Sequence, residues 1–188
     1  MTESFGAQVT LLHSNDRDDW DSEQFGQVLQ ASTGVWISGG NQEHLANVIL
    51  DTRSHRELEA VWQRGGAYGD VSGGAMLATS FMLRGLDGKP MLIARRHTRG
   101  FSLLQNVVIN PHLTAQQRES QLVTALHYRS ELLGVEIDNN TAIVVNGRTF
   151  TVVGDGRVAI YDNEPHGSRW FYYLDPGAVS DLTTRTVR

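Results

Sequence analysis

The sequence predicts one α/β domain spanning residues 1–188, a three-layer sandwich with a mostly parallel sheet and antiparallel carboxyl-terminal strands. Its 188 residues, 40% hydrophobic and 20% charged, have the length and composition of a single globular domain. Short apolar strands alternate with capped helices as far as Gly134, which is typical of α/β folds. Beyond it, short strands separated by glycine turns predict antiparallel pairing.

The predicted strands are short apolar runs bounded by turn residues. In the first part of the chain they are Gln8–His13, Gly34–Ser38, Ala67–Val71 and Leu103–Ile109. In the last part they are Val135–Ile137, Ala142–Val145, Phe150–Val153 and Val158–Tyr161.

Capping residues and helical spacing of apolar residues predict the helices. They are Ser22–Ala31, a helix opened by Asn41, and one opened by a Ser54/Glu57 capping box and ended by Gly65. A helix over Ala75–Leu83 follows, and a Thr114/Gln117 capping box opens a long helix running to Gly134.

The composition excludes several kinds of protein. The 16 basic and 21 acidic residues give a formal charge of −5, which offers no general attraction for nucleic acid or anionic lipid. Cysteine is absent, which excludes disulfides, thiolate metal sites and cysteine nucleophiles. No signal peptide or long apolar span is visible, so we expect a cytoplasmic protein with no membrane partner.

Ser72 is the first candidate for chemistry. It stands between a predicted strand and a predicted helix, with glycines behind it, a turn that exposes a hydroxyl and backbone N–H groups. The G-x-S-x-G pattern is incomplete, because Asp70 stands two residues before the serine. A serine followed by glycines also fits a plain turn or helix cap.

His112 follows the strand ending at Ile109, so it is expected at the same edge of the sheet as Ser72 and within reach as a base. It also fits a surface-loop histidine. No pair of histidines has zinc-ligand spacing, and the acidic run 16–21 lacks the glycine and glutamate of a calcium loop. We therefore predict no metal or cofactor, and interpret the acidic run as a solvated loop.

Four ordered segments together carry a family resemblance. They are TGVWISGGNQ at 33–42, GGAYGDVSGGA at 65–75, LLQNVVINPH at 103–112 and GVEIDNNTA at 134–142. In this order they resemble the cyanophycinase and peptidase E family of serine peptidases, most closely its cyanophycinase branch.

The resemblance implies a glutamine-amidotransferase-like sandwich with Ser72 as the nucleophile and His112 as its base. It also implies that the turns at Gly39, Gly40 and Gly73 shape the oxyanion and substrate pocket. Gln42 is then expected near the substrate.

This chain departs from the family at several of these positions. Asp70-Val71 replaces Gly-Thr before the serine, and Asn110-Pro111 replaces Asp-Gln before the histidine. The family's catalytic acid falls on Asn139, which carries no charge. Asp138 and Glu136 are possible substitutes for that acid, because neutralising it in a serine-protease triad costs on the order of 10⁴ in turnover.

The amino-terminal part is also shorter than in the family, because Gln8–His13 matches a strand that follows two strand–helix units. Those units cover part of the sheet, so their absence predicts an exposed apolar edge. We expect a second copy of this chain, as a homodimer, or a different subunit to cover it.

Two functions remain open. The first is a serine hydrolase that cleaves a peptide or isopeptide bond next to an aspartyl unit by acyl transfer through Ser72. The second is a non-peptidase descendant that uses the pocket for ligand binding, partner assembly or another reaction on an amino-acid-like ligand. Ser72 and His112 favour the first, whereas Asn139 and Asn110 favour the second.

Overall fold

The structure is a computed structural model that describes residues 6–86, 89–93, 98–113 and 121–188. Its helices are α1 (Arg17–Asp21), α2 (Glu23–Gln30), α3 (Gln42–Ile49), α4 (Arg53–Gln63), α5 (Gly73–Leu77) and α6 (Gln121–Tyr128). The first strands are β1 (Gly34–Ile37), β2 (Ala67–Asp70), β3 (Leu83–Leu86), β4 (Lys89–Ile93) and β5 (Val107–Pro111). The later strands are β6 (Leu133–Ile137), β7 (Thr141–Asn146), β8 (Thr149–Gly154), β9 (Val158–Tyr161), β10 (Tyr172–Leu174) and β11 (Val179–Asp181).

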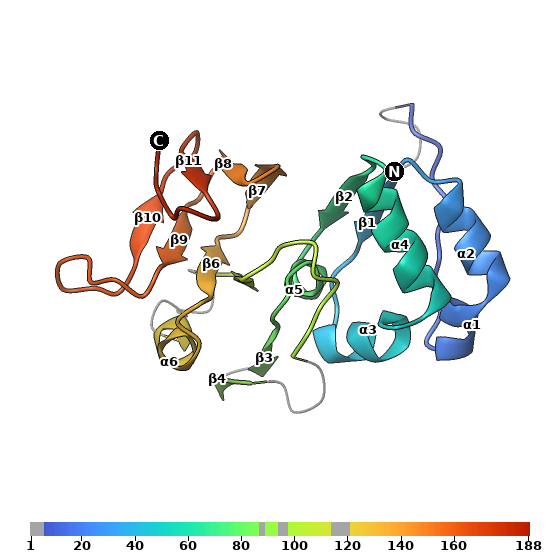
Figure 1. The fold of residues 1–188 in the computed structure, drawn as a ribbon, viewed down its shortest axis with the longest axis horizontal. Coiled ribbons are helices and arrows are strands. Elements are labelled where there is room, and N and C mark those ends of the chain that lie inside the picture. Colours follow the sequence, from blue (N-terminus) through green and yellow to red (C-terminus); the bar gives the residue numbers. More distant parts are fainter. Residues whose placement is uncertain (1–5, 87–88, 94–97, 114–120) are drawn as a thin grey trace.

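The amino-terminal half is built on the parallel pair β1–β2, with Gly34 opposite Ala67 and Ile37 opposite Asp70. Helices α1 to α4 lie beside this pair (Figure 1). The Asn41 side chain accepts a hydrogen bond from the N–H of His44, so it caps α3 as its sequence predicts. This half holds one core cluster, formed by apolar residues of β1, α3 and α4 and the segments around Leu77 and Phe101.

The carboxyl-terminal half contains two further sheets. One has the order β10-β9-β6-β5, in which β5 and β6 are parallel and the others antiparallel. The other has the order β11-β8-β7 and is antiparallel throughout. These strands confirm the antiparallel carboxyl-terminal end. Among the strands named above, β1–β2 and β5–β6 are the parallel pairs, and Thr79 forms a further parallel bridge with Leu104.

Helix α5 lies between the two halves of the chain, and all five of its residues are buried. Ala75 packs into the core around β5, β6 and β9, whereas Met76 packs into a cluster that includes α6. Figure 1 shows α5 between β2 and β6. Helix α5, which follows β2, is therefore packed against β5, the strand that leads to His112.

Two predictions near the amino terminus were wrong. Residues 8–13 form no strand, because their brief alternation finds no partner strand in the described part of the chain. The acidic run is not a loop throughout, since Asp16 caps α1 by accepting from the N–H of Asp18. Acidic side chains favour the first turn of a helix, where they face its positive end.

Three predicted helices have different ends. Thr52, not Ser54, caps α4 by accepting from the N–H of His55, and Ser54 is buried in the first turn. Helix α5 stops at Leu77, and the Thr79 hydroxyl lies 2.8 Å from the carbonyl of Met76, a local bond that competes with helix continuation.

The long helix predicted to end at Gly134 ends instead at Tyr128. A turn follows, in which the N–H of Leu132 donates to the carbonyl of Arg129, and Leu133 then begins β6. Its predicted capping box at Thr114 and Gln117 lies outside the described residues. The hairpin β3–β4, which carries a register shift between Arg84 and Leu86, was not predicted.

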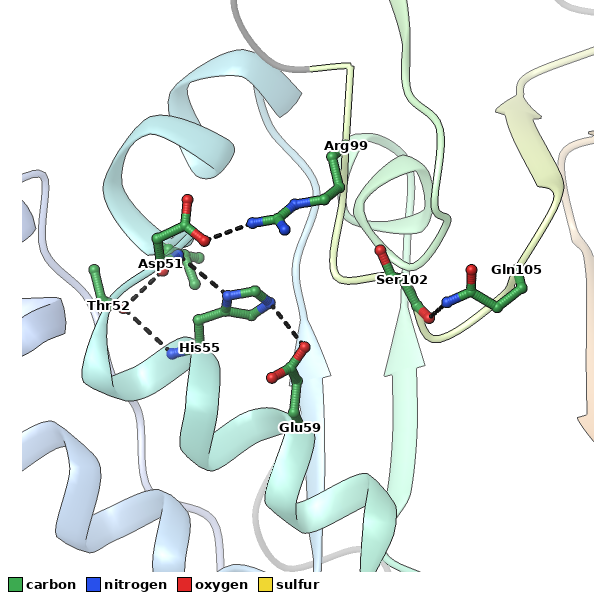
Figure 2. A network of polar contacts seen from close by, with 8 residues as sticks. Asp51, Thr52, His55, Glu59, Arg99, Ser102 and Gln105 are labelled. Carbon is green, nitrogen blue, oxygen red and sulfur yellow. Dashed lines mark hydrogen bonds and ion pairs between the residues drawn. The ribbon is translucent and has the colours of Figure 1, made fainter. Parts of the chain in front are cut away.

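His55 is a buried histidine at the junction of α3 and α4 (Figure 2). Its Nδ1 accepts from the N–H of Asp51 at 3.1 Å, its Nε2 lies 3.6 Å from Glu59, and its ring contacts Phe101. Asp51 in turn pairs with Arg99 at 2.5 Å. Burial lowers the pKa of His55, and the nearby carboxylates of Glu59 and Asp51 oppose that shift in part.

We expect acid to destabilise the fold through His55. Because its pKa is lower in the folded chain than the unfolded value of 6.5, the unfolded state binds the proton more readily. The free energy of unfolding should therefore fall as the pH drops below about 6.5. Urea denaturation between pH 7.5 and 5.5 should show a smaller pH dependence in His55→Gln, and an unchanged one in His13→Gln, whose side chain is exposed. Equal slopes in all three proteins would contradict this.

No helix in the part of the chain that the structure describes has the length and apolarity needed to span a membrane.

Candidate active site

Ser72 lies at the sharp turn between β2 and α5, as the sequence predicts. Its backbone has φ 55° and ψ −122°, a conformation that non-glycine residues rarely adopt. The N–H groups of Gly74 and Ala75 donate back to the carbonyls of Val71 and Ser72, which closes the turn. A strained serine at a strand–helix elbow points its hydroxyl away from the sheet, where a substrate can reach it.

His112 contacts this serine. Its Nε2 lies 3.1 Å from the Ser72 Oγ, within the 3.5 Å that a base and its nucleophile require. His112 also has a positive φ, 67°, and the next residue donates its N–H to the carbonyl of Ile137 on β6. The loop after β5 is thereby tied to β6, with its imidazole aimed at the elbow.

Asn139 completes a chain of three side chains. Its Oδ1 lies 2.7 Å from the Nδ1 of His112. In this orientation Nδ1 carries the proton and Nε2 keeps a lone pair for the Ser72 hydroxyl. A neutral asparagine oxygen can thus select the same tautomer as a carboxylate, as in the Cys-His-Asn sites of papain-like proteases, but it adds no negative charge.

The other two candidate orienting residues lie differently. Glu136 is fully buried, and its two oxygens accept from Asn110 at 2.6 Å and from the Tyr161 hydroxyl at 2.5 Å. Asp138 accepts from the backbone N–H of Asn139 at 2.9 Å. Of the three, Asn139 is the one whose side chain contacts His112. Asp138 holds the backbone of Asn139 through the hydrogen bond from its N–H.

The glycines expected around the nucleophile pack tightly against it. A Cβ on Gly39 would lie 2.9 Å from the Ser72 Cβ, and a Cβ on Gly73 would lie 2.1 Å from the carbonyl oxygen of Gly40. Side chains are therefore excluded from this contact, and the backbone of the 39–40 turn reaches the elbow. Gln42 opens α3 next to Gly73. Neither Gln42 nor the three glycines are among the residues that line the cavity described next.

A cavity of about 370 Å³ lies beside the three side chains. Ser72, His112 and Asn139 all line it, together with residues of β2, β5 and β7. Its walls are mostly apolar and include two tryptophans, Trp36 and Trp62, that are 68% and 38% exposed. Neither these tryptophans nor β7 was predicted at the site, because they come from β1, α4 and a later hairpin that only the fold brings together.

Asp70, two residues before the nucleophile, lines this cavity. Burial raises its pKa to about 6, and contact with Tyr68 lowers it only in part. Burial also raises the pKa of Tyr68. The Asp70 carboxyl, close to Ser72 in the sequence, therefore changes from neutral to negative as the pH rises through about 6.

We expect Asp70→Asn to stabilise the protein above pH 6 and not below pH 4. The folded chain holds the Asp70 proton more tightly than the unfolded chain, so the stability that this proton contributes is lost as pH rises toward 6. The shift from 3.8 to about 6 corresponds to about 3 kcal/mol at neutral pH. Denaturant titrations at pH 4 and 7.5 should show this difference, and Asp175→Asn, an exposed control, should show none. A gain of equal size at both pH values would contradict it.

Fold and site together define an α/β protein with a Ser-His-Asn arrangement of the serine-hydrolase type at a strand–helix elbow. The chain belongs to Peptidase family S51, whose family model matches residues 1–153. This family and the relatives below support a serine-type peptidase.

Curated relatives are cyanophycinases from cyanobacteria. Those of Trichormus variabilis and of a Nostoc species are each 30% identical over 201 residues, covering 99% of this chain and 63% of the relative. That of Synechococcus elongatus is 28% identical over 159 residues, covering 82% of this chain and 49% of the relative. The chain thus spans less than two thirds of their length.

Two solved structures show the fold. A peptidase from an acI-B1 Actinobacterium matches with a TM-score of 0.66 at 23% identity, over 88% of this chain and 66% of that one. A peptidase E candidate from Listeria monocytogenes EGD-e matches with a TM-score of 0.60 at 17% identity, over 82% and 74%. These likenesses confirm the predicted three-layer α/β sandwich.

Proposed function

We propose that this chain is a serine hydrolase that cleaves a peptide or isopeptide bond next to an aspartyl unit, with Ser72 as the nucleophile. The observation that carries the proposal is the continuous contact from Ser72 Oγ to His112 Nε2 and from His112 Nδ1 to Asn139 Oδ1, at 3.1 and 2.7 Å. Such a chain has a nucleophile, a base and a group that orients the base. The aspartyl preference rests on the cyanophycinase relatives.

The reaction would proceed by acyl transfer. Ser72 Oγ attacks the carbonyl carbon while its proton passes to Nε2 of His112. Backbone N–H groups of Gly73 and the 39–40 turn stabilise the oxyanion. The C–N bond then breaks, and the leaving amine takes the proton from His112. Water, deprotonated by His112, cleaves the acyl ester and restores Ser72.

Asn139 sets the expected speed of this reaction. A carboxylate would stabilise the imidazolium that forms after proton transfer, whereas the Asn139 amide oxygen contributes only its dipole. We therefore propose a slow peptidase.

The alternative function is ligand binding without hydrolysis, or another reaction on an amino-acid-like ligand. One observation favours it: Asp70 places a carboxylate in the approach to Ser72, where an aspartyl ligand would bring a second one. Two negative charges in an apolar cavity repel each other strongly.

Hydrolysis of matched dipeptides separates the two functions. The purified chain would be incubated with β-aspartyl-leucine and α-aspartyl-leucine at pH 5.5 and 7.5, and free leucine would be quantified by chromatography. We expect release of leucine from the β-linked peptide, faster with wild type than with Ser72→Ala. No release above the Ser72→Ala background at either pH, although the peptide binds, would favour the alternative.

We also propose that a second copy of this chain covers the outer edge of β1. In the described part of the chain β1 pairs only with β2, so its other edge is open. Sedimentation equilibrium at micromolar concentration should show a dimer. A monodisperse species of 20.8 kDa would overturn the proposal.

A further inference from the structure

Two strands line the cavity in an unusual way. Consecutive residues contribute to its wall, namely Tyr68–Asp70 of β2 with the following Val71 and Ser72, and Thr141–Val145 of β7. Successive side chains of a strand point to opposite faces, so a cavity on one face would meet only every second residue. A cavity that meets every residue in a run lies along the edge of that strand.

The free edge of β7 can be assigned from its pairing. Residues Asn146 and Thr149 close a two-residue hairpin loop, and the N–H of Asp155 donates to the carbonyl of Asn140 in the same register. Even-numbered residues of β7 therefore direct their backbone groups toward β8. The N–H and C=O groups of Thr141, Ile143 and Val145 point the other way, where no strand pairs with them among the described residues.

Strand β2 also has one edge whose backbone groups pair with no strand among the described residues. The N–H groups of Ala67 and Val71 donate to carbonyls of residues 33 and 37 at β1, so the backbone groups of Tyr68 and Asp70 point away from β1. In the described chain β2 has no second partner strand. Strand β2 ends just before Ser72 and β7 begins just after Asn139, so each free edge lies next to a catalytic residue.

We propose that the cavity takes its substrate as an extended peptide whose main chain hydrogen-bonds to the free edge of β7. This rests on the proposed function and deepens it, because it names the class of substrate. An extended chain added to an open strand edge gains its affinity from backbone hydrogen bonds, and pockets for alternate side chains add specificity. The cavity volume lies within the range of ligand sites.

The walls indicate which side chains the peptide carries. Trp36, Trp62, Leu104 and Ile137 offer apolar contact, whereas Asp70 is the acidic group on the β2 side. Small or apolar side chains are therefore accepted where the peptide passes these walls. The aspartyl unit of the proposed substrate is expected away from Asp70, whose carboxylate would repel it once ionised.

A reactive peptide tests this pairing. The probe is an acetyl-tetraalanyl diphenylphosphonate, compared with a butyl diphenylphosphonate that has the same reactive group and no amides. We expect the tetraalanyl probe to modify Ser72 at least tenfold faster. Methylating those of its amides that face β7 should abolish the advantage, and methylating the intervening amides should not. Equal effects of the two methylation patterns would overturn the proposal.

A second test changes β7 instead of the peptide. Ile143→Pro removes one free-edge N–H without removing a bond to β8, a position that an edge strand tolerates. We expect it to lower the ratio of the tetraalanyl rate to the butyl rate, both measured on the same variant, most of the way to one. An unchanged ratio would contradict the pairing.

If the proposed function is wrong, Ser72 is expected not to react with the probes. Amide hydrogen exchange does not depend on that reaction and tests the peptide contact by itself. Ser72→Ala would be measured by NMR with acetyl-tetraalanine amide at millimolar concentration. We expect at least tenfold slower exchange at Thr141, Ile143 and Val145, and no change at Ala142 and Val144. No slowing would overturn the proposal. Slowing without peptide that grows with protein concentration would also overturn it and assign the edge to a second copy.

Discussion

Replacing Ser72 with alanine is expected to reduce hydrolysis by at least about a thousandfold. Loss of the nucleophile in a triad enzyme costs on the order of 10⁶ in turnover, and a site without the orienting carboxylate starts from a lower rate. The remaining activity would come from binding and the oxyanion donors alone. Single-turnover rates on the dipeptide that wild type cleaves best give the measurement.

The matched control for this substitution is Ser130→Ala. Ser130 is exposed and lies after α6, in the other half of the chain, and it does not line the cavity. It should retain the wild-type rate. If Ser72→Ala keeps its melting temperature and also keeps the wild-type rate, the reaction takes place at another residue.

Restoring a carboxylate at position 139 should raise the rate. Asn139→Asp places a charged oxygen where Oδ1 now lies, 2.7 Å from His112 Nδ1, and Asn139→Glu places one from a longer side chain. Because the opposite change in a serine protease costs about 10⁴, we expect a gain of tenfold to about 10⁴-fold, larger for aspartate. Initial rates on the same dipeptide measure it.

Asn140→Asp is the control for added charge alone. Asn140 adjoins Asn139, is exposed and has a φ of 54°, a conformation that aspartate also tolerates. It makes no hydrogen bond to His112 among the described contacts. A gain in Asn140→Asp equal to that in Asn139→Asp would show that charge near the site, rather than contact with His112, increases the rate.

The sequence was sufficient for the elements whose signals are local. The Asn41 cap, the strand–helix turn at Ser72 and the hairpin at Asn146-Gly147 depend on residues a few positions apart, and each lies where it was predicted. The contact between Ser72 and His112 was also expected, because parallel strands of one sheet end at the same edge. In the structure β2 and β5 lie in different sheets, and the contact forms across them.

Predictions that depend on distant parts of the chain were wrong. Leu126 and Leu133 have helical spacing, but they reach the core from α6 and β6, on opposite sides of a turn. The alternation in residues 8–13 suits a strand that has no partner among the described residues.

The choice between three orienting candidates likewise needed the fold. Glu136 and Asn139 are three residues apart, yet one faces a buried network and the other faces His112. The direction of a side chain at the end of a strand is set by the packing around it, which spacing in the sequence does not encode.

Covalent labelling tests the central claim most directly, namely that His112 activates Ser72 as a nucleophile. The chain would be treated with a fluorophosphonate, digested, and the modified peptide identified by mass spectrometry. We predict one adduct, on Ser72, formed at least a hundredfold more slowly in His112→Ala and at the wild-type rate in His127→Ala, whose histidine lies on α6. An adduct on another serine, no adduct at all, or equal labelling of wild type and His112→Ala would contradict the account.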